Sequence, residues 1–315
     1  MSNSKSYIPH KPVLKKEAVA ELITDPEGIY IDATLGGGGH AEAILKNLSD
    51  TAQLFGIDQD DEALEAARNR LSDHARFTAI KGNFGYLSTL IPPELHGNIS
   101  GILLDLGVST HQISAPDRGF SYQEQGPLDM RMGNLIGTSA DDIVNGYSYK
   151  ELRDIIFHLG EEKRSREIAR AIIDNRPIEN TAELTNIIED VARGDQQVKS
   201  VARVFQAIRI EVNQELKMLR NALEQSLEVL KMGGRIVAIS YHSLEDRIVK
   251  YFFRSGNHKG KVPKDFYGHS VSPIEPVYKD IITPTEQEIQ KNPASRSAKM
   301  RVAQKIRDQD QEEVR

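Results

Sequence analysis

The strongest constraint on the fold is an alternation of short apolar segments and helical patterns in the first third of the chain. Four segments rich in β-branched, aliphatic and aromatic residues lie at 28–33, 53–58, 76–81 and 101–105. Each is bounded by Gly, Asp or Asn, which predicts buried strands. Helical patterns follow the first two strands, at 40–48 and 60–71. This order predicts βαβ units in a parallel sheet with right-handed crossovers, and therefore an α/β fold.

A large insertion interrupts this alternation, because a fifth strand is predicted only at 234–240. Helical patterns occur in the insertion at 150–158, at 161–175 and from Thr181 onward. Apolar side chains then recur every three or four residues from Val204 to Leu230, which predicts one long amphipathic helix ended by Gly233 and Gly234. We therefore expect a discontinuous domain, 1–116 with 212–315, and an inserted helical domain at 117–211.

The region after the fifth strand is less regular and more basic. The sequence pattern there predicts a helix that ends at Phe253, then a loop rich in Gly, Pro and His, and then two further strands near 278–282 and 298–306. Residues 247–307 contain 13 Lys and Arg against 5 Asp and Glu, although the whole chain carries a net charge of −6. Such a stretch can contact nucleic-acid phosphates, or it can be a set of solvated loop charges.

Several classes of protein are excluded by what the chain lacks. It contains no Cys, which rules out disulfides, thiolate nucleophiles and Cys-based metal sites. No His, Asp or Glu spacing resembles a metal site. No apolar segment approaches the roughly 18 residues of a membrane span, and no signal peptide is recognisable at the N-terminus. A cytoplasmic protein without a membrane partner is expected.

Four consecutive glycines, residues 36–39, lie between the first strand and the helix that follows it. Without Cβ atoms the backbone there can approach a ligand closely, although a simple flexible turn is the alternative. The pattern of Gly36, Gly38 and Ala41 partly matches a dinucleotide-binding fingerprint. Asp58 ends the second strand about 20 residues further on, where a carboxylate can bind ribose hydroxyls. The two features predict an adenosine-type cofactor, either NAD or S-adenosylmethionine.

Acidic residues at the ends of strands refine this choice. Asp32, directly before the glycine turn, suits a cationic ligand and disfavours a pyrophosphate, so S-adenosylmethionine is preferred. Phe84, after the third strand, is expected to contact adenine or to belong to the core. Asp105, at the end of the fourth strand, is a candidate acceptor beside an amino group or a cofactor ligand.

Two further groups of charged residues are candidates for substrate binding. Asp129 and Arg131 lie in a loop bounded by Gly and Pro. His242, Glu245 and Arg247 directly follow the fifth strand, although this segment can also be a helix start capped by Ser243.

Five segments, at 32–40, 101–109, 126–132, 205–210 and 242–247, resemble in order and spacing the ribosomal RNA small subunit methyltransferase H family (RsmH, also called MraW). The resemblance extends from Tyr7 to Ile306. It implies a class I, Rossmann-like S-adenosylmethionine-dependent methyltransferase with an inserted helical substrate-recognition domain. The implied reaction is methylation of the exocyclic N4 of a cytidine in the decoding region of bacterial 16S rRNA, within the small ribosomal subunit. By motif position it assigns cofactor contacts to Gly38, Gly39, His40, Asp58, Phe84, Asp105 and Gln112.

The chain departs from the family pattern in two places. Residues 199–203 read Lys-Ser-Val-Ala-Arg where a His-Pro-Ala-Thr-Arg-like stretch is expected, which could alter RNA contacts. Gly37 replaces a larger residue and is expected to loosen the turn. Since no Asn/Asp-Pro-Pro-aromatic motif is present at Asp105, a base-stacking ring must come from elsewhere, with Phe120, Tyr122 and Tyr241 as candidates.

Other functions stay open at this level. One is an NAD-dependent oxidoreductase, another an RNA-binding ribosome-assembly factor with a vestigial cofactor site, and a third a methyltransferase acting on protein or on a metabolite. The oligomeric state is also open, with a homodimer among the options.

Overall fold

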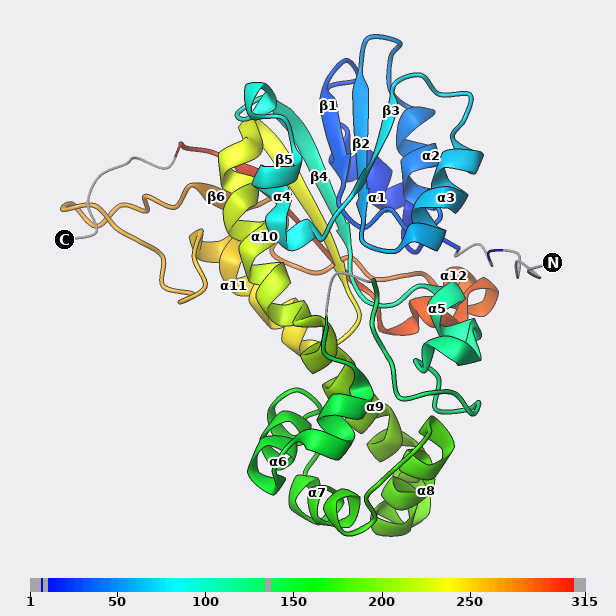
Figure 1. Cartoon of the computed structure of the whole chain (residues 1–315). Coiled ribbons are helices and arrows are strands. Elements are labelled where there is room, and N and C mark those ends of the chain that lie inside the picture. Colours follow the sequence, from blue (N-terminus) through cyan, green and yellow to red (C-terminus); the bar gives the residue numbers. More distant parts are fainter. Residues whose placement is uncertain (1–6, 8–10, 134–136, 309–315) are drawn as a thin grey trace. The chain divides into compact units, whose positions relative to one another are not determined.

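The computed structural model describes residues 7, 11–133 and 137–308. The chain divides into two compact units (Figure 1). The sheet unit contains Met1–Gly107 and Leu216–Arg315, and the helical unit contains Val108–Glu215. The units therefore change at 107/108 and 215/216, whereas the sequence placed the changes at 116/117 and 211/212.

The sheet unit is built on seven strands in the order β3-β2-β1-β4-β5-β7-β6. β1 to β5 run parallel, and β7 is antiparallel to both of its neighbours, β5 and β6. The strands are β1 Ile29–Asp32, β2 Gln53–Asp58, β3 Phe77–Lys81, β4 Ile99–Asp105, β5 Leu230–Ser240, β6 Ile274–Pro276 and β7 Lys299–Lys305. The strand order reverses direction between β1 and β4, as in doubly wound sheets. This confirms the predicted α/β, Rossmann-like class.

Helices cover both faces of this sheet, because successive strand residues point to opposite sides. Along β4, Ile102 and Leu104 belong to one apolar core, whereas Leu103 belongs to the other. The helices that pack on the Leu103 side are α1 Lys15–Leu22, α2 Gly39–Leu45 and α3 Asp61–Arg70. Those that pack on the opposite side are α4 Leu87–Leu90, α10 Glu215–Val229 and α11 Ser243–Ser255. A short helix, α12 Glu286–Lys291, precedes β7. Parallel strands buried on both faces explain the near-continuous apolar segments of the sequence.

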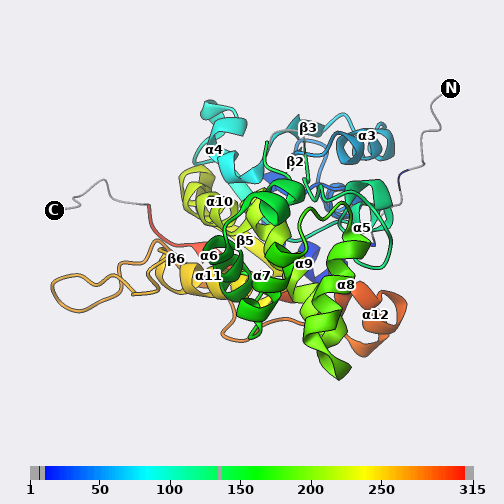
Figure 2. The same cartoon turned by 60° about the horizontal axis from the view of Figure 1, so that its bottom comes forward.

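The helical unit has its own apolar core, which includes Phe120, Leu152, Ile168 and Phe205. Its helices are α5 Thr110–Ser114, α6 Tyr149–His158, α7 Ser165–Asp174, α8 Thr181–Ala192 and α9 Gln197–Asn213. Figure 2 shows α6 to α9 grouped in this unit. Local signals set where two of these helices begin: Ser148 and Glu151 form a capping box at α6, and the Asn180 side chain accepts from a backbone N–H at the start of α8. Among the described residues, no helix combines the length and apolarity needed to span a membrane.

The single long helix predicted from Val204 to Leu230 is wrong, because the chain breaks at Gln214. This residue has φ 48° and ψ 36°, a left-handed conformation that ends α9, and α10 begins at the next residue. An ion pair spans the break: Arg209 Nε lies 2.8 Å from Glu215 Oε1, and Arg209 Nη2 lies 2.9 Å from Glu215 Oε2. The apolar stripe continues across the break, so periodicity alone gave no sign of it.

Three boundaries in the second half also differ from expectation. β5 begins at Leu230, inside the end of the predicted helix, and Gly233 lies within the strand at φ 78°. No strand forms at 278–282, where Ile282 makes one isolated bridge to Met300. Besides β5, the strand that pairs with β7 is β6, which the sequence did not predict. Short edge segments carry little periodicity, and tertiary pairing decides them.

Candidate active site

The glycine turn is positioned by the end of β1 and by the start of α2. Gly36 and Gly38 have φ of 49° and 77°, the left-handed region that glycine adopts without strain. A Cβ at Gly37 would lie 2.6 Å from Tyr7 Cε1, and one at Gly38 would lie 3.3 Å from the Cβ of Ala67 in α3. The missing side chains therefore allow protein segments to approach the turn. Gly37 accommodates the ring of Tyr7 where the sequence suggested only a looser turn.

Asp58 is bound to the same turn. Its Oδ2 accepts a hydrogen bond of 2.8 Å from the backbone N–H of Gly36, and its Oδ1 accepts one of 2.9 Å from that of Asp60. Burial raises the pKa of Asp58 to about 6, and these backbone N–H groups partly oppose the rise. The hydrogen bond from Gly36 thus connects the carboxylate at the end of β2 to the glycine turn after β1.

Asp32 is a buried carboxylate with one oxygen unused. Its Oδ1 accepts a hydrogen bond from the backbone N–H of Thr34 at 3.3 Å, whereas Oδ2 is buried without a hydrogen-bond partner among the described residues. Burial raises the pKa of Asp32 to about 6. A buried carboxylate lacking a partner is costly unless a cationic or hydrogen-bonding group binds it. Asp32 therefore fits a ligand that brings an ammonium or a sulfonium.

Asp105, the last residue of β4, is held from several directions. Its backbone N–H donates to Thr34 Oγ1 at 2.6 Å, and its Oδ1 accepts from the Tyr241 hydroxyl at 2.8 Å. Its Oδ2 lies 3.6 Å from His40 Nδ1. Burial and the neighbouring Asp105 carboxylate raise the pKa of Tyr241, so the phenol stays protonated and donates. Tyr241 thus orients the carboxylate, and Thr34 holds the backbone of Asp105.

His40 is buried at the start of α2. Its Nε2 lies 3.0 Å from the carbonyl oxygen of Val13, which can only accept, so the ring carries its proton on Nε2. Burial lowers the pKa of His40, which leaves the ring neutral at pH 7 with its Nδ1 lone pair facing Asp105. A neutral imidazole 3.6 Å from Asp105 can accept a hydrogen bond from a bound ligand.

The remaining predicted cofactor residues lie in different surroundings. Phe84 starts a short 3₁₀ turn after β3 and packs partly buried against the sheet core. The neighbouring Asn83 donates from Nδ2 to Gln59 Oε1 at 3.0 Å. Gln112 lies in the helical unit, where its Oε1 accepts from the backbone N–H of Ser109 in the capping box of α5.

The segment after β5 is a capped helix start, as the structural alternative proposed, but with different capping residues. α11 begins at Ser243 with His242 as its N-cap. Glu245 is buried; its Oε2 accepts from the backbone N–H of Tyr241 at 2.9 Å, and its Oε1 lies 3.2 Å from His242 Nε2. Arg247 is exposed. Ser243 as the capping residue is therefore wrong, and Glu245 has a structural role in the orientation of Tyr241.

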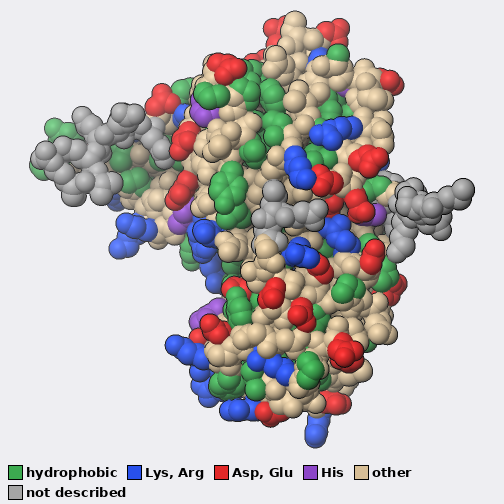
Figure 3. All heavy atoms as spheres, viewed as in Figure 1, with side chains coloured by type: hydrophobic (Ala, Val, Ile, Leu, Met, Phe, Trp, Pro, Cys, Tyr) green, Lys and Arg blue, Asp and Glu red, His purple; other side chains and the backbone are tan. Residues whose placement is uncertain are grey.

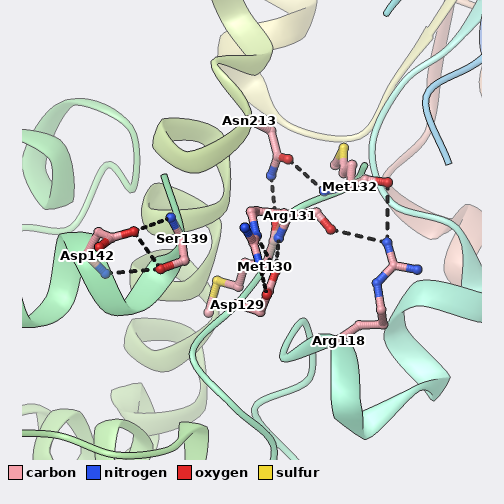
Figure 4. A network of polar contacts seen from close by, with 8 residues as sticks. All are labelled: Arg118, Asp129, Met130, Arg131, Met132, Ser139, Asp142 and Asn213. Atoms are coloured by element: carbon pink, nitrogen blue, oxygen red, sulfur yellow. Dashed lines mark hydrogen bonds and ion pairs between the residues drawn. The ribbon is translucent and has the colours of Figure 1, made fainter. Parts of the chain in front are cut away.

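Asp129 and Arg131 form an ion pair in the helical unit (Figure 4). Arg131 Nε lies 3.0 Å from Asp129 Oδ1, and Arg131 Nη2 lies 2.6 Å from Asp129 Oδ2. This pairing lowers the pKa of Asp129 against the effect of its burial. Both side chains remain partly exposed, at 29% for Asp129 and 38% for Arg131. The pair offers a guanidinium edge to solvent while its carboxylate stays ionised.

Residues that the sequence did not indicate hold this loop in place. Asn213, the last residue of α9, is buried; its Nδ2 donates to the Met130 carbonyl at 2.8 Å, and its Oδ1 accepts from Met132 N–H at 2.8 Å. Arg118 Nη2 donates to the Arg131 carbonyl at 3.1 Å. Met130, at φ 57°, needs such support because its left-handed backbone is strained. No sequence signal marks Asn213, since it lies within an apparently continuous helical stripe.

The segment 199–203, which departs from the family pattern, is buried at Ser200 and Val201, whereas Lys199 is exposed. Ser200 Oγ donates to Glu162 Oε2 at 2.9 Å, and Arg203 Nη1 lies 3.3 Å from the same oxygen. Desolvation raises the pKa of Glu162, but hydrogen bonds from the backbone N–H of Arg164 and from Ser200 and Arg203 outweigh it and hold that pKa below its usual value. Ser200, which departs from the family pattern, and Arg203, which agrees with it, therefore take part in a polar network around Glu162.

Comparison with known proteins places the chain. The model of the MraW methylase family matches residues 7–306. A protein of Parabacteroides distasonis named Ribosomal RNA small subunit methyltransferase H is 42% identical over 301 residues, which span 94% of this chain and 97% of that relative. The protein of the same name from Amoebophilus asiaticus is 45% identical over 306 residues, spanning 96% and 98%. The chain belongs to the MraW methylase family.

Proposed function

We propose that the chain transfers a methyl group from S-adenosylmethionine to the exocyclic N4 of a cytidine in the decoding region of 16S rRNA. Membership of the MraW methylase family supports methyl transfer, and the names of the relatives support small-subunit rRNA as the substrate. The observation that carries the proposal is the fixed carboxylate of Asp105 at the sheet edge that also holds Asp32 and Asp58. The reaction belongs in the cytoplasm, where this substrate is made.

The residues around the glycine turn fit the methyl donor. When bound, S-adenosylmethionine supplies an electrophilic methyl group on a sulfonium. Asp32 would bind its cationic portion, and Asp58 would accept from the ribose hydroxyls. The full set proposed to hold it is Gly38, Gly39, His40, Asp58, Phe84, Asp105 and Gln112. A pyrophosphate, by contrast, would be repelled by ionised Asp32, which argues against NAD.

Asp105 is proposed to activate the nitrogen. The lone pair of cytosine N4 is conjugated with the ring, so N4 is a weak nucleophile until a hydrogen-bond acceptor draws on one of its protons. The carboxylate of Asp105 is that acceptor, and it would take the proton that N4 loses as the N–CH₃ bond forms; the bond from the methyl group to the donor sulfur would break, with the electron pair left on sulfur as a neutral thioether. The Tyr241 hydroxyl donates to Oδ1 and so holds the carboxylate in one orientation. Orientation by Tyr241 reduces the reorganisation needed during transfer.

The substrate RNA is proposed to be bound by the helical domain, 117–211, and by the start of α11. Asp129 and Arg131 would contact the RNA in the first, and His242 and Arg247 in the second, where the buried Glu245 would position Tyr241 and His242. Arg131 is suited to a phosphate because its guanidinium is partly exposed and held by Asp129. Figure 3 shows further Lys and Arg side chains on the surface of the helical unit. The target base must be unstacked, as in a single-stranded region of the small subunit.

The proposal is tested by incubating small subunits from a strain lacking this protein with the protein and labelled S-adenosylmethionine, and then mapping the labelled nucleotide. Label on N4 of one cytidine is expected. Label on a uracil, a purine or protein contradicts the proposal, and RNA binding without any label favours an assembly factor.

The role of Asp105 is tested with the Asp105→Asn variant. It should lose methyl transfer by orders of magnitude, whereas Asp280→Asn, the same change at an exposed carboxylate, should not. Retained S-adenosylmethionine affinity in Asp105→Asn would assign Asp105 to the chemical step, and lost affinity would assign it to cofactor binding.

A further inference from the structure

An arm, residues 257–272, connects α11 to β6 and leaves the body of the sheet unit in both cartoon views (Figures 1 and 2). Its two sides are joined by hydrogen bonds from Asp265 N–H to the His269 carbonyl and from Val271 N–H to the Pro263 carbonyl, each 2.9 Å. It therefore has the form of a short hairpin whose tip lies at residues 265–269.

The tip is a turn held by hydrogen bonds to one carboxylate. Asp265 Oδ1 accepts from the backbone N–H groups of Tyr267 at 2.9 Å and His269 at 2.8 Å, and Gly268 turns the chain at φ 87°. The carboxylate of Asp265 is thus used inside the turn. The turn displays two aromatic rings, of which Phe266 is 98% exposed and Tyr267 is 81% exposed. Two adjacent rings held in water by a shaped turn contribute little to folding, which indicates a binding partner.

The flanks of the arm are basic. Lys259, Lys261 and Lys264 are exposed, and none of them forms an ion pair with a described residue. Arg254 supports the base of the arm by donating from Nη2 to the Gly260 carbonyl at 2.6 Å. Free cations beside open aromatic faces are the combination that binds single-stranded nucleic acid, through phosphate contacts and base stacking.

The aromatic residues that the sequence suggested for base stacking are engaged elsewhere. Phe120 is buried in the helical core, Tyr122 packs edge-on against Phe205 at 5.7 Å, and Tyr241 bonds to Asp105. The tip of the arm, in contrast, carries the two most exposed large hydrophobic side chains among the described residues.

We infer that the arm binds a single-stranded segment of the RNA substrate, with bases stacked on Phe266 and Tyr267 and backbone phosphates bound by Lys259, Lys261 and Lys264. The inference rests on the proposed function, because it takes rRNA as the substrate. A lipid surface is the other partner that exposed rings and lysines could fit. RNA is favoured because the tip presents flat aromatic rings and a histidine, without an aliphatic cluster that would insert into acyl chains.

The decisive experiment uses Phe266→Trp in the full-length protein, because the chain contains no Trp and the new indole would be the only one. Its emission is followed while an unstructured RNA oligonucleotide of about 12 nucleotides is added, with binding measured separately by anisotropy of labelled RNA. Quenching that follows the bound fraction is expected. Unchanged emission at saturating RNA overturns the inference. A blue shift with phosphatidylserine vesicles and no response to RNA overturns it in favour of lipid.

Substitutions separate stacking from apolar contact. Phe266→Ala with Tyr267→Ala should weaken RNA binding by about fivefold or more for each stacked base. The matched pair Phe266→Leu with Tyr267→Leu keeps apolar bulk without aromatic faces and should behave like the Ala pair. Wild-type affinity in the Leu pair overturns stacking.

The phosphate contacts are tested through the salt dependence of RNA binding. Changing Lys259, Lys261 and Lys264 together to Gln should reduce the salt slope by about 2, at about 0.7 for each phosphate contact. Lys15→Gln with Lys16→Gln, on exposed positions of α1, should leave the slope unchanged. An unchanged slope in the arm variant overturns the phosphate contacts.

Methyl transfer by the wild-type protein, measured in parallel on small subunits, separates the two proposals. If the wild-type protein transfers the methyl group but the indole emission of Phe266→Trp does not respond to RNA, the inference about the arm is refuted and the proposed function stands. Absence of both transfer and RNA binding in wild type refutes the proposed function.

Discussion

Removing the hydroxyl of Tyr241 provides the sharpest test of the active-site geometry. In Tyr241→Phe the 2.8 Å hydrogen bond from the phenol to Asp105 Oδ1 is lost, while the ring remains. Hydrogen bonds to charged groups contribute about 1.5–3 kcal/mol. Since Asp105 keeps the backbone contact to Thr34 and lies near His40, we expect the lower half of this range to appear in the transition state. The predicted loss in the rate of methyl transfer is therefore about 13-fold to 45-fold.

A second consequence is a shift in the pH profile. The Tyr241 hydroxyl stabilises the ionised form of Asp105, so its removal raises the pKa of that carboxyl. The acidic limb of the rate profile should then move to higher pH. A residue that only supports folding would lower the rate uniformly and leave the limb in place.

The assay is single-turnover transfer of labelled methyl to small subunits between pH 5 and 8, with S-adenosylmethionine affinity measured by calorimetry. Tyr278→Phe is the matched control, because it removes another phenol–carboxylate hydrogen bond, from Tyr278 to Glu21 at 2.8 Å, in an exposed position. Tyr278→Phe should keep the wild-type rate and pH profile. A wild-type rate and an unshifted limb in Tyr241→Phe would refute the role of Tyr241 in orienting Asp105.

Three further predictions follow from the described contacts. S-adenosylmethionine affinity should be constant above pH 7 and fall below pH 6, because Asp32 and Asp58, with pKa values raised to about 6, become protonated there. Calorimetry in buffers of different ionisation enthalpy should show that protons are released on binding near pH 6. The Asp32→Asn variant should release fewer protons. Asn213→Ala should lower the free energy of unfolding, measured by urea denaturation, by about 1–3 kcal/mol. The variant leaves two buried backbone groups without a partner, the Met130 carbonyl and the Met132 N–H. Equal stability of variant and wild type would contradict this. Gly38→Ala should weaken S-adenosylmethionine binding and destabilise the fold by about 1 kcal/mol or more. The reason is that φ at this position is 77° and that the new Cβ would lie 3.3 Å from Ala67 of α3. Wild-type affinity together with wild-type stability would refute this prediction.

Much of the sheet unit could be predicted from the sequence because its signals are local. Buried parallel strands appear as continuous apolar segments, and the Gly and Asp residues at their ends mark the turns. The pattern predicts β2 at its observed ends, Gln53–Asp58, and it predicts one cofactor site for the glycine turn and Asp58, which a hydrogen bond joins. The family was recognisable because five motifs keep their order along the chain.

Tertiary structure alone decided the features that depend on residues far apart in the chain. Tyr241 and Asp105 are 136 positions apart, and Asn213 bonds to residues 81 and 83 positions away. Gln214 favours a helix locally, yet the Arg209–Glu215 ion pair and the contacts of Asn213 accompany a break there that no periodic pattern reveals. The sequence by itself determined the layered sheet, the motifs and the acidic residues that the site uses. Only the folded chain decided which oxygen of each carboxylate is occupied, because hydrogen-bond geometry depends on which distant side chains the packing brings together.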